Sequence, residues 1–574
     1  MSIAHTRHHE AAACPHALVI GSGFGGLAAA IRLRVKGYRV TVLEKLAEPG
    51  GRARVFRQDG YVFDAGPTIV TAPFLLEELW TLCGRRLADD VRLVPMHPFY
   101  RIRFADGSHF DYSGDAQAMR REVSRFCASD LEGYERFMEK AAECYRLGFE
   151  ELGAVAFDSF RDLLAALPNM VRMRAWRSIH ALVCDHFRDE RLRIVMSFHP
   201  LLIGGNPFSV TGVYSLIASL ERRFGVHFAM GGTGALIRGM VGLLERLQVP
   251  VLCAREVKSI LIEDGAARGV EFADATTLRA DLVVSNADTA YTYRHMIAPA
   301  HRRFWTDRRI ERGRYSMSLF VWYFGTDRRY EDVPHHMLIL GPRYEALLRD
   351  IFRRHRLADD FSLYLHRPTA TDPSLAPPGC DAFYALSPVP HLDSGTDWTT
   401  RAEPYRAAVQ RALEASVLPD LGKHVRTSRI VTPLYFAQDL RSIKGAAFGL
   451  EPILTQSAWF RPHNRSEDIR DLYFVGAGTH PGAGIPGVLS SAKALDALLP
   501  AAVDYLRGAA PPAVVGRRRR SAAGHGQPDR AGGVLPARGA SASGWSGNAL
   551  APAHQVQPSG AAVVGSASRP SSGA

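Results

Sequence analysis

Two glycine-rich stretches, one near each end of the 574-residue chain, have the residue types and spacing of a ligand site. The first, ALVIGSGFGGLAAAIRLRVKGYRVTVLEK over residues 17–45, reads as strand, turn, helix and strand. Gly21, Gly23 and Gly26 form G-x-G-x-x-G, which allows a tight turn, close approach to a pyrophosphate and close helix packing. Glu44, 18 residues after Gly26, is placed to accept hydrogen bonds from a ribose. The stretch predicts a dinucleotide-binding βαβ unit, although an ordinary glycine-rich βαβ turn remains the alternative.

The residues that follow indicate which dinucleotide binds. Arg52 comes directly after Gly50-Gly51, and an acid–Ala–Gly–Pro turn follows at residues 64–67. A basic residue and such a turn suit a bound flavin better than a freely exchanging nicotinamide. On its own, the loop could equally carry only a solvated charge.

The second stretch, DLYFVGAGTHPGAGIPGVLSSAKALDALL over residues 471–499, repeats the pattern of strand, glycine turn and helix. Leu472–Val475 is the expected strand and Val488–Leu499 the expected helix. The positive end of that helix dipole would stabilise negative charge on a reduced flavin. Two such turns make sense together if both face one long ligand.

Composition excludes several classes of function. The seven cysteines are scattered without a C-x-x-C pair, so we expect reduced thiols, a reducing compartment and no metal site. Of the net charge of +12, half lies after residue 507, where seven arginines accompany one aspartate. The body of the chain is only mildly basic and lacks a basic stripe with interleaved aromatic residues, so no nucleic-acid partner is expected.

Membrane contact, if present, should be peripheral. No apolar run reaches the roughly 18 to 20 residues that span a bilayer, and the N-terminus lacks the apolar core of a signal peptide. Residues 163–201 are mostly helical in pattern and alternate arginines with apolar residues. Such a basic amphipathic segment lies either at an anionic membrane surface or against the core with a solvated face.

The predicted fold class is α/β, with a Rossmann-type dinucleotide domain discontinuous in sequence, a mixed sheet and helix substrate domain, and a helical membrane-facing region. Short β-branched strands near residues 249–285 should resume the first sheet after a long insertion. The tail is rich in Ala, Gly, Ser, Pro and Arg and is predicted to be disordered. The expected segments are a polar extension (1–16), the dinucleotide domain in three parts (17–110, 231–295 and 446–507), the helical region (111–230), the substrate domain (296–445) and the tail (508–574).

From about Ala17 to Leu499 the chain strongly resembles bacterial-type phytoene desaturases. The resemblance rests on both glycine stretches, on HRPTATDPSLAPPGCDAFYALSPVPHL (366–392) and on LEPILTQSAWFRPHNRSEDIRDLYFVGAGTHPGAGIPGV (450–488). It implies FAD as the organic cofactor and stepwise desaturation of 15-cis-phytoene to neurosporene or lycopene. It also implies oxygen or a quinone as electron acceptor, and peripheral attachment to membrane lipid at the cytoplasmic face of the cell membrane.

The glycine motifs and the resemblance together give a set of candidate FAD-binding residues: Gly21, Gly23, Gly26, Glu44, Lys45, Gly51, Arg52, Val257, Gly478, Gly487 and Val488. Desaturation removes a hydride and a proton, so a carboxylate near the flavin could stabilise the cation or accept the proton. Asp162 matches the family's acidic position and is the catalytic candidate. The family often has an arginine three positions later, where this chain has Ala165.

Two other functions remain open. A related carotenoid oxidoreductase, such as a hydroxyneurosporene desaturase, ketolase or isomerase, would share both glycine stretches and differ in its substrate tunnel. A lipid-binding relative without redox chemistry would be expected to have lost parts of the flavin-binding motif, which is intact here.

Overall fold

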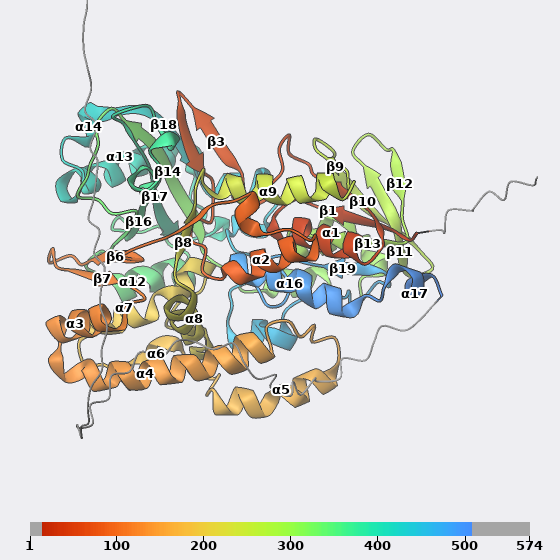
Figure 1. Ribbon diagram of the computed structural model, residues 1–574, viewed down its shortest axis with the longest axis horizontal. Coiled ribbons are helices and arrows are strands. Elements are labelled where there is room, and N and C mark those ends of the chain that lie inside the picture. The colour runs from red at the N-terminus through yellow and green to blue at the C-terminus, as the bar shows by residue number, and fades with distance from the viewer. Residues whose placement is uncertain (1–13, 508–574) are drawn as a thin grey trace, which may run out of the picture. The chain divides into compact units, whose positions relative to one another are not determined.

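The computed structural model describes residues 14–507. The predicted tail (508–574) lies outside the described residues, as does nearly all of the predicted N-terminal extension (1–16). Figure 1 shows the order of the elements along the chain.

A five-stranded parallel sheet, in the order β19-β13-β1-β2-β9, is assembled from distant parts of the sequence. Its strands are β1 (His16–Ile20), β2 (Arg39–Leu43), β9 (Val251–Leu252), β13 (Leu282–Ser285) and β19 (Leu472–Phe474). Successive side chains of a strand point to opposite faces, and in β1 Ala17 and Val19 pack on one face while Leu18 and Ile20 pack on the other. The discontinuous Rossmann-type sheet predicted from the sequence is confirmed.

Each face of this sheet is covered. Helices on one face share a core with Ala17 and Val19; they are α1 (Phe24–Val35), α2 (Pro73–Leu82), α9 (Thr233–Arg246) and α16 (Ile485–Leu498). An antiparallel three-stranded sheet joins the core on the other face; it comprises β10 (Val257–Glu263), β11 (Ala266–Phe272) and β12 (Thr277–Arg279). The fully buried alanines at positions 28–30 let α1 contact α16 closely.

A second, seven-stranded sheet has the order β18-β14-β17-β16-β15-β6-β7 and is antiparallel except between β15 and β6. Its strands are β6 (Tyr100–Arg103), β7 (His109–Tyr112), β14 (Ser318–Thr326), β15 (His336–Ile339), β16 (Leu363–His366), β17 (Asp381–Val389) and β18 (Val425–Val431). Strand β6 lies in the segment predicted as the first dinucleotide part (17–110), yet it pairs with β15. The hairpin of β6 and β7 therefore belongs to the second sheet, and a hairpin sequence alone does not say which sheet it joins.

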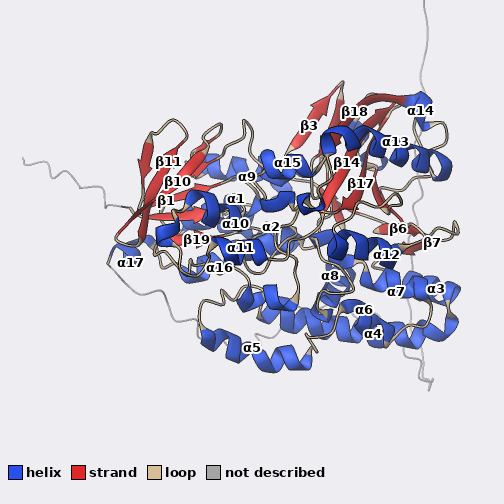
Figure 2. Cartoon of the chain, turned by 180° about the vertical axis from the view of Figure 1, so that it is seen from behind, coloured by secondary structure: helices blue, strands red, loops and turns tan. Residues whose placement is uncertain are grey.

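A group of helices lies below both sheets, apart from the strands, as Figure 2 shows. These are α3 (Ala116–Phe126), α4 (Leu131–Cys144), α5 (Phe160–Arg172), α6 (Ile179–Cys184), α7 (Glu190–Ser197) and α8 (Leu216–Phe224). The remaining regular elements are β3 (Val55–Gln58), β4 (Tyr61–Asp64), β5 (Leu93–Pro95), β8 (His227–Ala229), α10 (Thr289–Tyr291), α11 (Asp307–Arg312), α12 (Tyr344–Arg349), α13 (Trp398–Ser416), α14 (Leu421–His424), α15 (Pro433–Gln438) and α17 (Ala502–Leu506). Within residues 14–507, no helix is both long and apolar enough to cross a bilayer.

Candidate active site

A cavity of about 560 Å³ is shared by the two sheets and the helical region. Its walls include residues of the first glycine turn and its surroundings, of the seven-stranded sheet, and of the helical region: Gly21, Gly23, Glu44, Gly51 and Arg52; Leu319, Val321, Tyr323, Tyr364 and Tyr384; and Phe149, Ala166, Met170, Met173 and Glu221. One end is therefore glycine-rich and charged, and the other is mainly apolar. This division suits a ligand with a polar part and an apolar reactant beside it.

The first glycine turn supplies both space and donors. Gly23 caps α1, whose first-turn N–H groups have no acceptor within the helix. A Cβ at Gly26 would overlap the carbonyl oxygen of Gly21, so the turn can pack on the helix only with glycine there. Gly21 and Gly23 line the cavity, whereas Gly26 does not. The helix N-terminus can therefore receive a phosphate at Gly21 and Gly23, while Gly26 serves packing.

Three further candidates lie along the same part of the cavity. The Glu44 carboxylate is buried, and its Oε2 accepts hydrogen bonds from the Ser22 N–H (2.8 Å) and hydroxyl (2.6 Å). These bonds fix a carboxylate that still has lone pairs for a ribose hydroxyl. Lys45 and Val257 also line the cavity, and burial lowers the pKa of Lys45.

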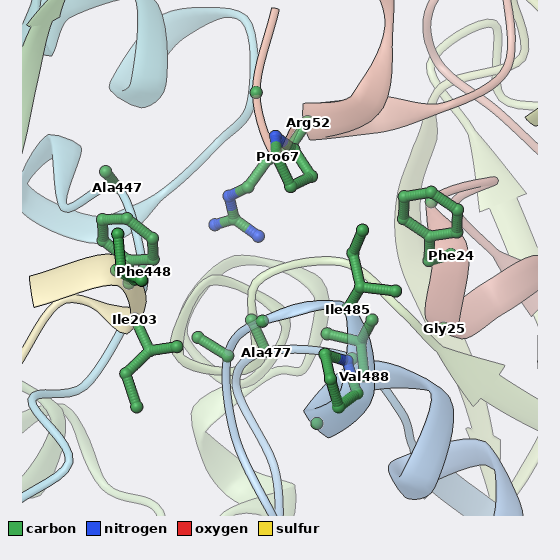
Figure 3. Close-up of a pocket in the computed structure, with 18 of the residues that line it drawn as sticks. Phe24, Gly25, Arg52, Pro67, Ile203, Ala447, Phe448, Ala477, Ile485 and Val488 are labelled. Atoms are coloured by element: carbon green, nitrogen blue, oxygen red, sulfur yellow. The ribbon is translucent and has the colours of Figure 1, made fainter. Parts of the chain in front are cut away.

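Arg52 extends its guanidinium into the cavity between Pro67 and Phe448, as Figure 3 shows. One terminal nitrogen donates to the Ser442 hydroxyl at 3.0 Å, but the buried Nε has no partner among the described residues. Burial lowers the pKa of Arg52, and nearby Asp288 opposes that effect. A buried, partly unpartnered guanidinium is suited to an anionic or carbonyl group of a ligand.

The second glycine turn is held by two buried side chains that sequence reasoning missed. Arg461, 1% exposed, donates to the carbonyl oxygens of Ala477 (2.7 Å) and Thr479 (3.1 Å). The Asn464 side chain donates to the carbonyl oxygens of Phe474 (3.2 Å) and His480 (3.1 Å). Their only sequence signal was an arginine and an asparagine shortly before a buried strand.

The predicted residues of this turn divide into two groups. Gly487 and Val488, at the start of α16, line the cavity. Gly478 does not, because it packs against the start of α10, where a Cβ would overlap the Thr289 hydroxyl. Asn286, which follows β13, was not predicted but lies in the cavity wall between the two glycine turns.

The structure does not bring Asp162 to the cavity. Its Oδ2 accepts hydrogen bonds from the Ser159 N–H (3.0 Å) and hydroxyl (2.8 Å), which makes Asp162 the third residue of a capping box at the start of α5. That carboxylate points back along the chain to satisfy the helix end. Ala166 and Met170 of the same helix line the cavity instead.

A different carboxylate, Glu221 of α8, lines the apolar part of the cavity. Its side chain is fully buried and accepts a hydrogen bond from the Tyr100 hydroxyl at 2.7 Å. The Nε2 atom of His199 lies 3.2 Å from its other oxygen. Glu221 could not be selected from the sequence, since a Glu-Arg-Arg run near a helix end usually forms a solvated face.

The residues present fit FAD. The N-terminus of α1 can bind its pyrophosphate, Glu44 its ribose, and the free N–H of Arg52 a polar edge of the flavin, while α16 presents a second helix N-terminus. A family profile described as flavin containing amine oxidoreductase matches residues 24–494. The chain belongs to this family of flavoproteins.

Within the family, the chain is similar to bacterial phytoene desaturases. It is 49% identical over 500 residues to the neurosporene-forming enzyme of Cereibacter sphaeroides, covering 86% of this chain and 96% of that protein. It is 48% identical over 479 residues to the lycopene-forming enzyme of a Paracoccus species, covering 83% and 96%. The resemblance found in the sequence is confirmed.

The fold is also similar to that of a solved oxidase. Putrescine oxidase bound to putrescine aligns with a TM-score of 0.58 and 13% identity, covering 86% of this chain and 99% of that structure. At this identity the likeness concerns the fold alone.

Proposed function

We propose that the chain is an FAD-dependent phytoene desaturase that converts 15-cis-phytoene in steps to neurosporene or lycopene. The observation that carries this proposal is a cavity that continues from the glycine turns into walls of apolar side chains. The similarity of the chain to desaturases that form neurosporene or lycopene supports the same substrate.

Each step removes a hydride and a proton from adjacent sp³ carbons beside a polyene. Bound FAD supplies the hydride acceptor. The chain's own apolar residues, among them Leu319, Val321 and Met170, exclude water and hold the polyene against the flavin site. We assign to Glu221 the stabilisation of the allylic cation and the acceptance of the proton, because it is the buried carboxylate of the apolar wall.

We also propose that α5 docks on the cytoplasmic face of the cell membrane. One side of the α5 segment contributes Ala166, Met170 and Met173 to the cavity wall. Its other side exposes a run of large apolar side chains: Phe160 (60% exposed), Leu164 (50%), Leu167 (42%), Val171 (59%) and the nearby Trp176 (62%). An apolar surface of this kind, with exposed Arg161 and Arg174, suits an anionic lipid interface. Phytoene would pass from the bilayer beneath α5 into the cavity.

The reduced flavin must be reoxidised for each further step. We propose oxygen or a quinone as the acceptor, since the membrane-facing position of α5 would give access to quinones dissolved in the bilayer.

The function is tested by incubating FAD-loaded protein with liposomes that contain 15-cis-phytoene in air, and by separating the extracted pigments. The proposal expects neurosporene or lycopene, with none from heat-denatured protein. Conversion of a later carotenoid but not of phytoene would instead identify a related carotenoid oxidoreductase. If no polyene is converted although FAD is bound, the proposed desaturase function is refuted.

A further inference from the structure

Three histidines meet within the seven-stranded sheet, behind the cavity wall. His336 begins β15 and His366 ends β16, and the strand register places the two directly opposite each other. His335 precedes β15, and all three residues are buried. One ring nitrogen from each lies within 4.8 Å of the other two.

The outer nitrogens of two of the rings are already fixed by hydroxyl groups. His335 Nδ1 lies 2.6 Å from the Thr371 hydroxyl, and His336 Nδ1 lies 2.6 Å from the Tyr364 hydroxyl. At the Nε2 atoms, His335 shares a hydrogen bond of 3.1 Å with His366, while the buried His336 Nε2 has no hydrogen-bond partner among the described residues.

We propose that the Nε2 atoms of His335, His336 and His366 form a binding site for a divalent transition metal of the zinc class. Two imidazole nitrogens on one tetrahedral zinc are about 3.3 Å apart, given Zn–N bonds of about 2.0–2.1 Å. The 3.1 Å between His335 and His366 is close to that spacing. The hydroxyls of Thr371 and Tyr364 can accept the other ring N–H, a role that a carboxylate, backbone carbonyl or water usually has at metal-binding histidines.

The burial of the three rings also suits a metal, because burial disfavours the charged imidazolium and metal ligation requires the neutral ring. The inference departs from the sequence-based expectation of no metal site, which rested on the cysteines alone.

A metal here would join β15, β16 and the segment before β15. It would also hold His336 against the hydroxyl of Tyr364, whose side chain lines the cavity. The site would thus be a structural metal site behind the cavity wall, and it requires no redox chemistry of the metal.

The test is titration of chelator-stripped, FAD-loaded full-length protein with Zn²⁺ in a calorimeter. Because His5, His8 and His9 could bind metal by themselves, the reference protein carries His5→Gln, His8→Gln and His9→Gln. We expect one zinc per chain in this background, with affinity reduced roughly 100-fold or more by His366→Gln. The matched control is His16→Gln, since His16 is equally buried but lies in the other sheet. Absence of zinc binding, or equal binding by the His366→Gln protein, would overturn the proposal.

A second measurement does not depend on the folding of a variant. X-ray absorption of the zinc-loaded reference protein should show three imidazole nitrogens at about 2.0–2.1 Å, and a shell without them would contradict the site. Neither readout requires desaturase activity, so failure here is distinguishable from failure of the proposed function.

Discussion

At the scale of single residues, Gly26 shows how one missing Cβ shapes the cofactor site. In the Gly26→Ala variant the new methyl group would overlap the Gly21 carbonyl oxygen and push the turn away from α1. We expect loss of bound FAD and a decrease of about 1–3 kcal/mol in the free energy of unfolding, as for overpacked cores. Flavin absorbance of the purified protein and denaturant unfolding measure the two effects.

Gly242→Ala is the control for that substitution. Gly242 lies within α9, where a Cβ would meet only the end of the Arg246 side chain at 3.5 Å. Alanine there should retain FAD and raise stability by about 0.5–1 kcal/mol. Full FAD content in the Gly26→Ala protein would contradict the packing role.

The two carboxylate candidates can be separated by a pair of variants. Glu221→Gln should lower the rate of desaturation at least about 100-fold, the range of general acid–base contributions, with FAD still bound. Asp162→Asn should keep near-normal turnover, because Asp162 caps α5 outside the cavity wall, and should cost only about 1 kcal/mol of stability. Single-turnover rates with phytoene decide between them, and the reverse order of effects would restore Asp162 as the catalytic candidate.

His480 should make the fold sensitive to acid. Burial lowers its pKa to about 4, although a contact with the Leu152 carbonyl opposes the effect. Between the unfolded value of about 6.5 and the folded value, the unfolded chain binds a proton that the folded chain does not. Stability is therefore retained above about pH 6.5 and decreases as the pH falls towards 4, by at most about 3 kcal/mol.

His480→Gln should remove that component from the pH dependence of unfolding. Denaturant unfolding of both proteins at pH 5 and pH 7.5 gives the comparison. If the free energy of unfolding changes by the same amount in both proteins between pH 5 and pH 7.5, His480 contributes nothing to the acid sensitivity.

At the scale of elements, periodicity predicted the strands and helices of both glycine stretches, because burial imposes the pattern locally. In β14, Leu319, Val321 and Tyr323 face the cavity side while Phe320, Trp322 and Phe324 face the core beneath α13. What periodicity could not predict is which element meets which. Contacts with residues far away in the sequence determine the pairing of β6 with β15. They also determine the position of Gly478 outside the cavity wall.

The prediction about membrane binding concerns the exposed apolar side of helix α5. Replacing Phe160 and Val171 together by serine removes two large exposed apolar side chains. Binding to anionic vesicles should weaken roughly tenfold or more per residue, since each loses about 1.5–3 kcal/mol of burial, and FAD content should not change. Vesicle sedimentation measures this.

The matched control is Val503→Ser with Leu506→Ser on α17, whose side chains are 59% and 51% exposed. Those changes should leave vesicle binding as it is. An equal loss in both double variants would show that exposed apolar area in general, rather than α5, determines binding.

At the scale of the whole molecule, one cavity depends on segments that are hundreds of residues apart in the sequence. Gly21 and Gly23, Asn286, and Gly487 with Val488 meet there because β1, β13 and β19 are neighbours in one sheet. The glycine motifs predicted both ends of this arrangement. The apolar wall with Glu221, and the bracing by Arg461 and Asn464, could not be predicted because buried polar residues have no periodic pattern of their own.

The most direct test of the account is a single turnover without oxygen. FAD-loaded protein is mixed anaerobically with liposomes containing 15-cis-phytoene, while the visible flavin band and the extracted pigments are followed together. We predict that the flavin bleaches as phytoene loses hydrogen, in a stoichiometry of one double bond per flavin. A flavin that stays fully oxidised while phytoene remains unchanged would contradict it.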